Sequence, residues 1–405
     1  MPQDADEDQY RRGFALQQAG RHAEAVAVYR DLAARVLTLK LATNLGLSLG
    51  EIGERGEAVR YLTLAARHRP QDRTIGRLLA TAQAEAGDTV SAEAGYLALL
   101  DAHPDDGEAQ LALAGLYLSL GRYAEGWPLL AARTVLHAAV VPPVDPGFPE
   151  WRGQPLAGKA VLVWIEQGFG DQIQMARFAN ALKARGAARV TLGCRPALAH
   201  LFSTLAGVDA VIPIATRGVV DVGLHDYWSR YFSLPEHLGV TLEHLPAEPY
   251  LGAPADRLER WKNFGGGARV GLVWQASSTG FNGANKGLPP DQARRLLDAG
   301  AVSLQPEDTG AGDFADTAAI VDGLDLVISI DTAVAHLAGA MGKPCWTLLP
   351  YVHSDWRWLR ERRDSPWYPQ MRLYRHGDRR DWPGVVDRVL ADLAAAGLTR
   401  GLGAP

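Results

Sequence analysis

Four glycines recur at a nearly constant spacing in the first third of the chain, and this repeat limits the possible folds more than any other feature. Gly20, Gly53, Gly87 and Gly121 are 33, 34 and 34 residues apart. A small residue stands seven positions before each glycine, and a bulky residue stands nine positions after it. A fixed period of this length indicates helical hairpins that bury their apolar faces only by stacking on one another.

The segments that begin at these glycines follow the tetratricopeptide pattern: GRHAEAVAVY, GERGEAVRYL, GDTVSAEAGY and GRYAEGWPLL. The small residue lets the two helices of a unit approach closely, and the glycine ends the first helix. We therefore predict an all-α tetratricopeptide solenoid of about four repeats over residues 1–139. Such an array is either a scaffold or a concave groove that holds a polypeptide, and the repeats do not decide between the two.

A segment rich in proline and glycine follows the predicted array. Residues 140–158 are expected to be a linker, because prolines cannot continue a helix. Trp151 lies within this segment and is expected to dock on a neighbouring domain.

Charge and hydropathy exclude several classes of protein. The formal net charge of −5 gives no reason to expect nucleic acid, which requires a concentrated basic face. The acidic N-terminus resembles neither a secretory signal nor a transit peptide. The longest apolar stretch, residues 324–350, is interrupted by Asp331 and Lys343 and predicts strand, helix and strand instead of a membrane span. We expect a cytoplasmic protein in which Cys194 and Cys345 are buried thiols instead of a disulfide.

From Lys159 onward, short β-rich runs alternate with helical segments, which predicts parallel sheets covered by helices. A glycine triplet at 265–267 separates two such series. We therefore predict two Rossmann-like lobes, residues 159–255 and 256–405. The first has room for only four or so strands. A ligand is expected between the lobes, at the carboxyl ends of the strands.

The first of three notable strand-to-helix loops is EQGFGDQIQMARF. Gly168 and Gly170 give its backbone freedom, and Asp171 follows them at the start of the expected helix. Asp171 is either a helix cap or a general base directed into the cleft between the lobes.

The other two loops carry candidate phosphate ligands. In SIDTAVAHLAGAMGKP, Asp331 and Thr332 can cap a helix whose free N–H groups and dipole suit a diphosphate. His336 in the same segment either faces that ligand or is a core histidine with its hydrogen bonds satisfied. In WQASSTGFNGANKGLPP, Lys286 either neutralises phosphate charge or is an ordinary solvated lysine.

Several segments of the chain resemble a known group of bacterial proteins. They are VLVWIEQGFGDQIQMARF, RVGLVWQASS, NKGLP, DFADTAAIVDGLDLVISIDTAVAHLAGAMGKPCWTLLP and DWRWLRERRDSPWYPQMRLYR. In that group a tetratricopeptide array precedes a transferase related to glycosyltransferase family nine, the lipopolysaccharide heptosyltransferases. The resemblance covers nearly all of the chain after Leu156. More distantly, the layout is similar to O-linked N-acetylglucosamine transferases of the SPINDLY kind and to flagellin-modifying transferases.

This resemblance implies an α + α/β architecture, in which the solenoid precedes two lobes of the GT-B kind and the first lobe is reduced. It also implies that Asp171 is the catalytic base. The residues that it implies for binding the donor and its phosphates are Gly168, Gly170, Lys286, Asp331, Thr332, Ala333 and His336.

We therefore predict an inverting, metal-independent transfer of sugar from a nucleotide-sugar donor to an acceptor hydroxyl on a protein that the array holds. None of the three loops carries a DxD pattern, so no metal is assigned, and no cofactor is expected because the nucleotide sugar is a substrate. Two alternatives stay open: a degenerate transferase fold that acts as a binding or scaffold protein, and a lipopolysaccharide heptosyltransferase. The reduced first lobe and the short stretch PEDTGAG after Gln305 favour the degenerate fold.

Overall fold

A computed structural model describes residues 2–136, 143–215, 220–276, 283–377 and 380–399. The chain divides into two compact units. Unit 1 contains Met1–Leu118 together with Tyr351–His353, and unit 2 contains Ser119–Pro350 and Ser354–Pro405. The expected boundary between residues 139 and 140 lies outside the described residues. No helix in the described ranges is both long enough and apolar enough to cross a membrane.

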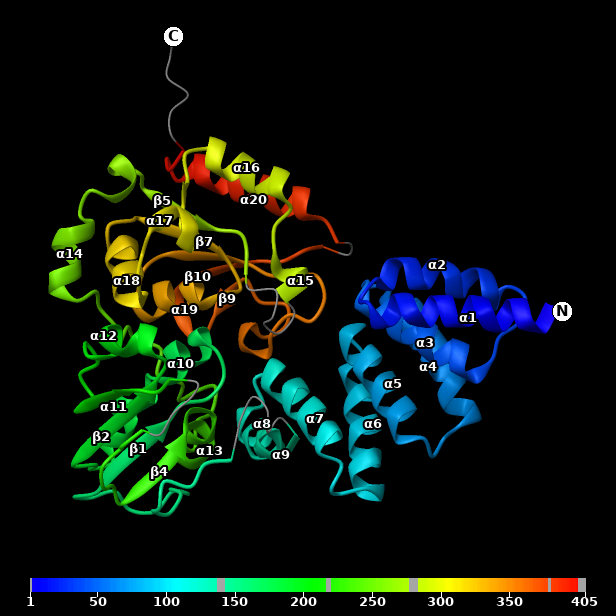
Figure 1. Cartoon of the computed structure of the whole chain (residues 1–405), viewed down its shortest axis with the longest axis horizontal. Helices are drawn as coiled ribbons and strands as arrows, with labels where there is room; N and C mark the ends of the chain where they lie inside the picture. Colours follow the sequence, from blue (N-terminus) through cyan, green and yellow to red (C-terminus); the bar gives the residue numbers. More distant parts are fainter. Residues whose placement is uncertain (1, 137–142, 216–219, 277–282, 378–379, 400–405) are drawn as a thin grey trace, which may run out of the picture. The chain divides into compact units, whose positions relative to one another are not determined.

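Unit 1 is built from helices that pair along the chain as hairpins (Figure 1). These helices are α1 (Pro2–Gln18), α2 (His22–Ala33), α3 (Leu39–Glu51), α4 (Arg55–His68), α5 (Arg73–Glu85), α6 (Thr89–Ala102) and α7 (Gly107–Ser119). The repeat prediction is confirmed at its glycines. Gly20, Gly53, Gly87 and Gly121 all have left-handed backbones, with φ of 71, 84, 89 and 77°. Glycine adopts this conformation without steric cost, which is why it stands where each first helix ends.

The small residues of the repeat also have the predicted role. A Cβ atom on Gly46 would lie 2.7 Å from Cγ of Leu62, and one on Gly13 would overlap the ring of Tyr29. In these two units the bulky side chain therefore occupies the space that the small residue leaves between the two helices. Tyr29 and Leu62 are buried as a result.

The second helix of the fourth repeat belongs to unit 2 and not to the compact array. It comprises α8 (Tyr123–Leu129), η1 (Leu130–Ala132) and α9 (Arg133–Leu136). The buried indole of Trp127 donates to the carbonyl of Val240 at 3.0 Å, and the indole of Trp367 donates to the Tyr123 hydroxyl at 2.8 Å. The glycine period predicted the helix, but it could not show that these aromatic side chains anchor it to the α/β fold.

The first sheet of unit 2 has four parallel strands in the order β3-β2-β1-β4, so the expectation of a reduced lobe is confirmed. The strands are β1 (Ala160–Trp164), β2 (Arg189–Cys194), β3 (Ala210–Pro213) and β4 (Tyr227–Arg230). The helical segments of this lobe are α10 (Phe169–Met175), α11 (Phe178–Ala184), η2 (Pro196–Leu198), α12 (Ala199–Phe202), η3 (Tyr231–Ser233) and α13 (Leu234–Leu238). The chain moves outward from β1 to β3 and then returns to the other side of β1. The strand order therefore reverses between β1 and β4.

The end of the proline-rich segment is part of this lobe. The amide of Trp151 donates to the carbonyl of Trp228 at 2.7 Å, and the amide of Trp228 donates to the carbonyl of Pro149 at 3.1 Å. These bonds add the segment to the outer side of β4. The Trp151 side chain is fully buried, which confirms the expectation that it docks on a neighbouring domain.

The second sheet has six strands in the order β6-β5-β7-β8-β10-β9, and only β9 runs antiparallel to its neighbour. The strands are β5 (Val270–Val273), β6 (Val302–Ser303), β7 (Leu326–Ile330), β8 (Cys345–Leu348), β9 (Asp364–Ser365) and β10 (Tyr368–Tyr374). The helical segments are α14 (Ala255–Trp261), η4 (Phe264–Gly267), α15 (Gly283–Lys286), α16 (Pro290–Asp298), α17 (Pro306–Thr309), α18 (Phe314–Asp322), α19 (Ala333–Ala340), η5 (Trp356–Trp358) and α20 (Trp382–Ala395). The strand order here reverses between β5 and β7.

Helices α16 and α20 pack on one face of the second sheet, where Leu272, Ile328 and Val386 are buried in one apolar cluster. The two cysteines are free and buried, as the sequence predicted. Burial raises the pKa of both the Cys194 and the Cys345 thiols to about 12, so neither thiol is a ready nucleophile at neutral pH.

Candidate functional site at the carboxyl ends of the two sheets

Two of the predicted loops meet inside unit 2, where α10 of the first lobe lies against α19 of the second (Figure 1). The contact is close because Gly170 has no side chain. A Cβ atom at this position would lie 2.8 Å from Cδ2 of His336 and 3.3 Å from Cα of Ala333. Gly170 therefore allows the loop of Asp171 to approach the first turn of α19. This approach brings the candidate base and the candidate phosphate site together.

The Asp171 carboxylate is bound on both of its oxygens. Its Oδ2 accepts the amide N–H of Gly168 at 2.9 Å, and its Oδ1 accepts a hydrogen bond from the guanidinium of Arg357. Gly168 is the N-cap of α10, so Asp171 is the third residue of the helix and not its first. Its side chain accepts the backbone N–H of the N-cap residue and thereby caps the start of the helix. The side chain stays 23% exposed, which leaves it accessible to a ligand.

Arg357 was not predicted from the sequence, although it makes the contact that crosses from the second lobe to Asp171. Its guanidinium also forms an ion pair with Asp355 at 2.7 Å, and its Nε donates to Oε1 of the buried Gln174. Burial alone would lower the pKa of Arg357, but Asp355 and Asp171 hold it above its usual value. The arginine is therefore a permanent cation at the centre of the interface between the lobes.

The first turn of α19 has free backbone donors. Thr332 is the N-cap, but its hydroxyl bonds to Ser329 at 2.9 Å and does not cap the helix. The amide of Ala335 donates back to the Thr332 carbonyl at 3.1 Å. The amides of Ala333 and Val334 have no hydrogen-bond partner within the described part of the chain. An anion is the natural ligand of such a helix end.

Lys286 and Asp331 lie together at the point where the strand order of the second sheet reverses. The ammonium Nζ is 2.8 Å from Oδ2 of Asp331, and the two side chains are 13% and 6% exposed. The contact is an ion pair without the alignment of a hydrogen bond, so Oδ2 keeps an unused acceptor position among the described residues. The geometry thus brings Lys286, whose role the sequence left open, to the predicted phosphate site.

His336 is buried beneath this site. Its Nδ1 is 3.0 Å from the Tyr368 hydroxyl, and its ring stacks on Trp358 with the centroids 5.2 Å apart. Burial holds the pKa of His336 well below its usual value, and the nearby charge of Arg357 adds to the effect. This position matches the core alternative for His336, and its contact with a donor stays a prediction.

The corresponding edge of the first sheet holds a second buried pair that the sequence did not reveal. Glu166 follows β1, and its carboxylate accepts from Arg133 at 3.2 and 3.3 Å and from the amide of Phe232 at 2.5 Å. Arg133 also donates to the Ser233 hydroxyl at 3.1 Å. Glu166 directly precedes the glycine loop in the sequence, and this position could have marked it as a candidate site residue. Nothing in the sequence connects it to Arg133.

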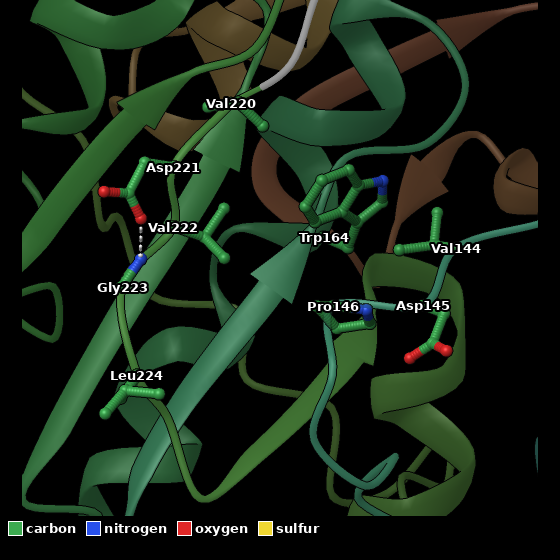
Figure 2. A pocket seen from close by; sticks show the side chains of 9 residues that line it. All are labelled: Val144, Asp145, Pro146, Trp164, Val220, Asp221, Val222, Gly223 and Leu224. Carbon is green, nitrogen blue, oxygen red and sulfur yellow. Dashed lines mark hydrogen bonds between the residues drawn. The ribbon is translucent and has the colours of Figure 1, made fainter.

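A cavity of about 430 Å³ lies elsewhere in the first lobe (Figure 2). Its lining consists of Val144, Asp145, Pro146, Trp164, Val220, Asp221, Val222, Gly223 and Leu224. Figure 2 shows the indole of Trp164 between the two chain segments, while the Asp221 carboxylate bonds to the Gly223 amide at 2.9 Å. None of the predicted site residues lines it. We place the candidate site at the meeting loops because the charged and donor groups lie there.

No protein-family model matches this chain. Protein FlbA of Caulobacter vibrioides (strain ATCC 19089 / CIP 103742 / CB 15) is 27% identical over 432 residues, which cover 94% of this chain and 72% of FlbA.

Solved structures show similarities to parts of the chain. The glycosyl transferase family 9 protein from Veillonella parvula DSM 2008 is 12% identical, covers 62% of this chain and 93% of its own, and has a TM-score of 0.43. A tetratricopeptide repeat protein from Parabacteroides merdae ATCC 43184 is 24% identical, with coverages of 34% and 56% and a TM-score of 0.29. MamA is 15% identical, with coverages of 33% and 79% and a TM-score of 0.30. The elements of the chain themselves give the fold class, a helical repeat array followed by two α/β sheets.

Proposed function

We propose that this protein transfers a glycosyl group from a nucleoside-diphosphate sugar to an acceptor hydroxyl, with inversion and without a metal. One observation carries the proposal: the loop of Asp171 touches the first turn of α19 through Gly170 and Ala333. The Asp171 carboxylate and the unpaired amides of α19 thereby lie on two loops in contact, and Lys286 pairs with Asp331 directly before α19. These loops follow the carboxyl ends of parallel strands, where α/β proteins bind nucleotides.

In the proposed reaction, the Asp171 carboxylate removes the proton of the acceptor hydroxyl. The acceptor oxygen then forms its bond to the anomeric carbon as the bond from that carbon to the diphosphate oxygen breaks. The leaving diphosphate keeps the electron pair, and its charge is stabilised by Lys286 and by the amides of Ala333 and Val334. Asp331 holds the Lys286 ammonium group beside the first turn of α19 through their ion pair.

The helical array supports a protein as the acceptor. Tetratricopeptide-like hairpins stack into surfaces that bind polypeptides, and this chain places such hairpins directly before the α/β unit. We propose that the array presents a segment of that protein acceptor to the site.

A second candidate is a binding protein that holds a nucleotide sugar without turnover. It is favoured by the state of Asp171, whose two oxygens are engaged by the Gly168 amide and by Arg357. A carboxylate in that state caps a helix and joins two lobes even if it never accepts a proton.

The test begins with the thermal unfolding of the purified chain in the presence of UDP-, GDP- and ADP-linked sugars. Only a ligand that binds the folded state raises the unfolding temperature, by RT ln(1 + [L]/Kd) in free energy. The donor identified in this way is then assayed for release of nucleotide, with and without an extract of candidate acceptor proteins. Stabilisation with release supports the transferase, and stabilisation without release supports the binding protein. If none of the sugars stabilises the chain, both proposals fail.

A further inference from the structure

The backbone is strained on both sides of the contact between the lobes. Gln167, next to the glycine loop, has φ of 60°, and Leu359, two residues after Arg357, has φ of 53° and ψ of −176°. Residues with side chains rarely adopt such conformations, which persist only when the surroundings impose them. Both strained residues lie within four positions of the Asp171–Arg357 pair.

Each strained segment is fixed by an arginine that donates to backbone carbonyls. Arg195 donates to the carbonyl of Gln167 at 3.1 Å. Arg375 donates to the carbonyls of Trp358 and Leu359 at 2.6 and 2.8 Å. Burial lowers the pKa of Arg375 to about 10, so the desolvation of this second arginine is itself costly. Arginine side chains thus hold both strained segments in a single backbone conformation.

The guanidinium of Arg357 joins the two segments. It holds Asp171 on one side and is itself held by Asp355 and Gln174 on the other. A guanidinium offers five donors in a rigid plane and can serve three such partners at once, which the single nitrogen of an ammonium cannot do in the same geometry. The arrangement fixes the rotation of the Asp171 carboxylate more strongly than the Gly168 amide alone would.

We infer that Arg357 is a positioning residue for the transfer reaction, because it holds the Asp171 carboxylate in the orientation that takes the proton of the acceptor. The inference rests on the proposed function. Arg357 acts through Asp171 and does not react itself. Its loss should therefore slow the chemical step and leave donor binding nearly unchanged, because the groups that bind the donor, Lys286 and the α19 amides, do not depend on it for a hydrogen bond.

The test compares Arg357→Lys and Arg357→Ala with the intact chain. Misplacement of a reacting group costs roughly 100-fold in rate, so we expect kcat of both variants to fall by about that factor while KM for the donor changes by less than about threefold. Guanidinium chloride at millimolar concentration, far below denaturing levels, should restore part of the kcat of Arg357→Ala. Arg362→Lys is the matched control, because Arg362 lies in the same segment and pairs with Asp364 at the surface. It should keep the kcat of the intact chain.

The outcomes separate this inference from the proposed function. An intact chain that binds a donor but does not transfer sugar contradicts the proposed function and removes the inference with it. An active chain whose Arg357→Lys variant keeps more than half of kcat overturns the inference alone. Loss of the unfolding transition in both variants, or a kcat of Arg357→Ala that guanidinium does not raise, shows that Arg357 only maintains the fold and also overturns the inference.

Discussion

In both sheets the strand order reverses next to the first strand of the sheet, but the charged side chains at the carboxyl ends of those strands differ. At the edge of the first sheet, between β1 and β4, the side chains of Arg133 and Glu166 are 4% and 0% exposed. At the edge of the second sheet, between β5 and β7, Lys286 and Asp331 remain 13% and 6% exposed. Each edge thus holds one pair of opposite charges at the point where the strand order reverses.

The difference shows how one topology serves two purposes. At the first edge both oxygens of Glu166 accept hydrogen bonds, from Arg133 and from the Phe232 amide, so the buried pair holds the start of the glycine loop. The second edge keeps two free amides and an unused carboxylate position. We therefore expect an anionic ligand at the strand-order reversal of the second sheet, and the first sheet contributes a loop.

The largest expected effect concerns the loop that the first sheet contributes. Asp171→Asn should lower sugar transfer by about two to four orders of magnitude, the range for loss of a general base. The amide oxygen of asparagine can still accept the Gly168 N–H, so the helix cap is retained. The NH2 group of asparagine then faces Arg357 and cannot accept its hydrogen bond, so the variant removes the charge and the bond to Arg357 together. The measurement is the rate of nucleotide release at saturating donor.

Asp381→Asn is a suitable control, because the Asp381 carboxylate also caps a helix, as the N-cap of α20 that accepts the Gly384 amide, and it lies outside the site. It should leave transfer unchanged. Retention of more than half the activity in Asp171→Asn would reduce Asp171 to a helix cap and favour the binding protein.

The second prediction tests whether the first edge is closed for structural reasons. Arg133→Met removes one partner and leaves the Glu166 carboxylate buried without its counter-ion, which should destabilise unit 2 by about 3–5 kcal/mol. Adding Glu166→Gln in the same chain should recover a large part of this loss. Chemical denaturation of the single and double variants measures both values. A single variant as stable as the intact chain would mean that solvent reaches this edge.

The sequence predicted much of this fold because its strongest signals are local and periodic. The repeat glycines required left-handed backbones at Gly20 and Gly53, and an apolar run such as Leu326–Ile330 could only be a buried strand. The strand Tyr227–Arg230 was not predicted, because its sequence YWSR lacks the apolar run that marks a buried strand. In the structure it pairs with β1 and with the end of the linker.

Some residues of the candidate site could be predicted from the sequence, and others could not. Gly170, Asp171 and Asp331 follow apolar strands, and position in a strand-to-helix loop is visible in the sequence. Arg357 and Arg133 were not found, because their partners Asp171 and Glu166 are 186 and 33 residues away in the chain. The pairing of two distant charges depends on how the lobes fold together, which no local pattern expresses.

The third prediction concerns the open edge. Lys286→Met should weaken binding of the preferred nucleoside diphosphate by roughly 10- to 100-fold, the loss of a hydrogen bond to a charged group, and should leave binding of the bare nucleoside unchanged. Calorimetric titration gives both affinities. The variant also frees Asp331 to repel phosphate, so the double variant with Asp331→Asn should bind the diphosphate better than Lys286→Met alone. Equal losses for nucleoside and diphosphate would place the phosphates away from Lys286.

The smallest effect is the pH dependence that His336 adds beneath the open edge. Burial keeps the folded-state pKa of this histidine well below 6.5; Arg357, Lys286 and Arg177 lower it further, and Asp355 opposes them. Because the unfolded chain binds a proton near pH 6.5 and the folded chain does not, the stability that neutral His336 contributes is complete above that pH and is lost as the pH falls. One such group gives a slope of at most about 1.4 kcal/mol per pH unit.

Other groups make the comparison with a variant necessary. The pKa of His376 is lowered to about 4 by burial, which gives a slope of the same sign, and the Glu51 carboxylate raises the pKa of His353, which gives the opposite sign. The free energy of unfolding should therefore be measured between pH 7 and 5 for the intact chain and for His336→Gln, which can still bond to Tyr368. The difference between the two slopes isolates His336, and the intact chain should have the steeper loss toward acid. Parallel curves would mean that His336 takes up its proton in the folded state, and hence that the centre of the site between the lobes is open to water.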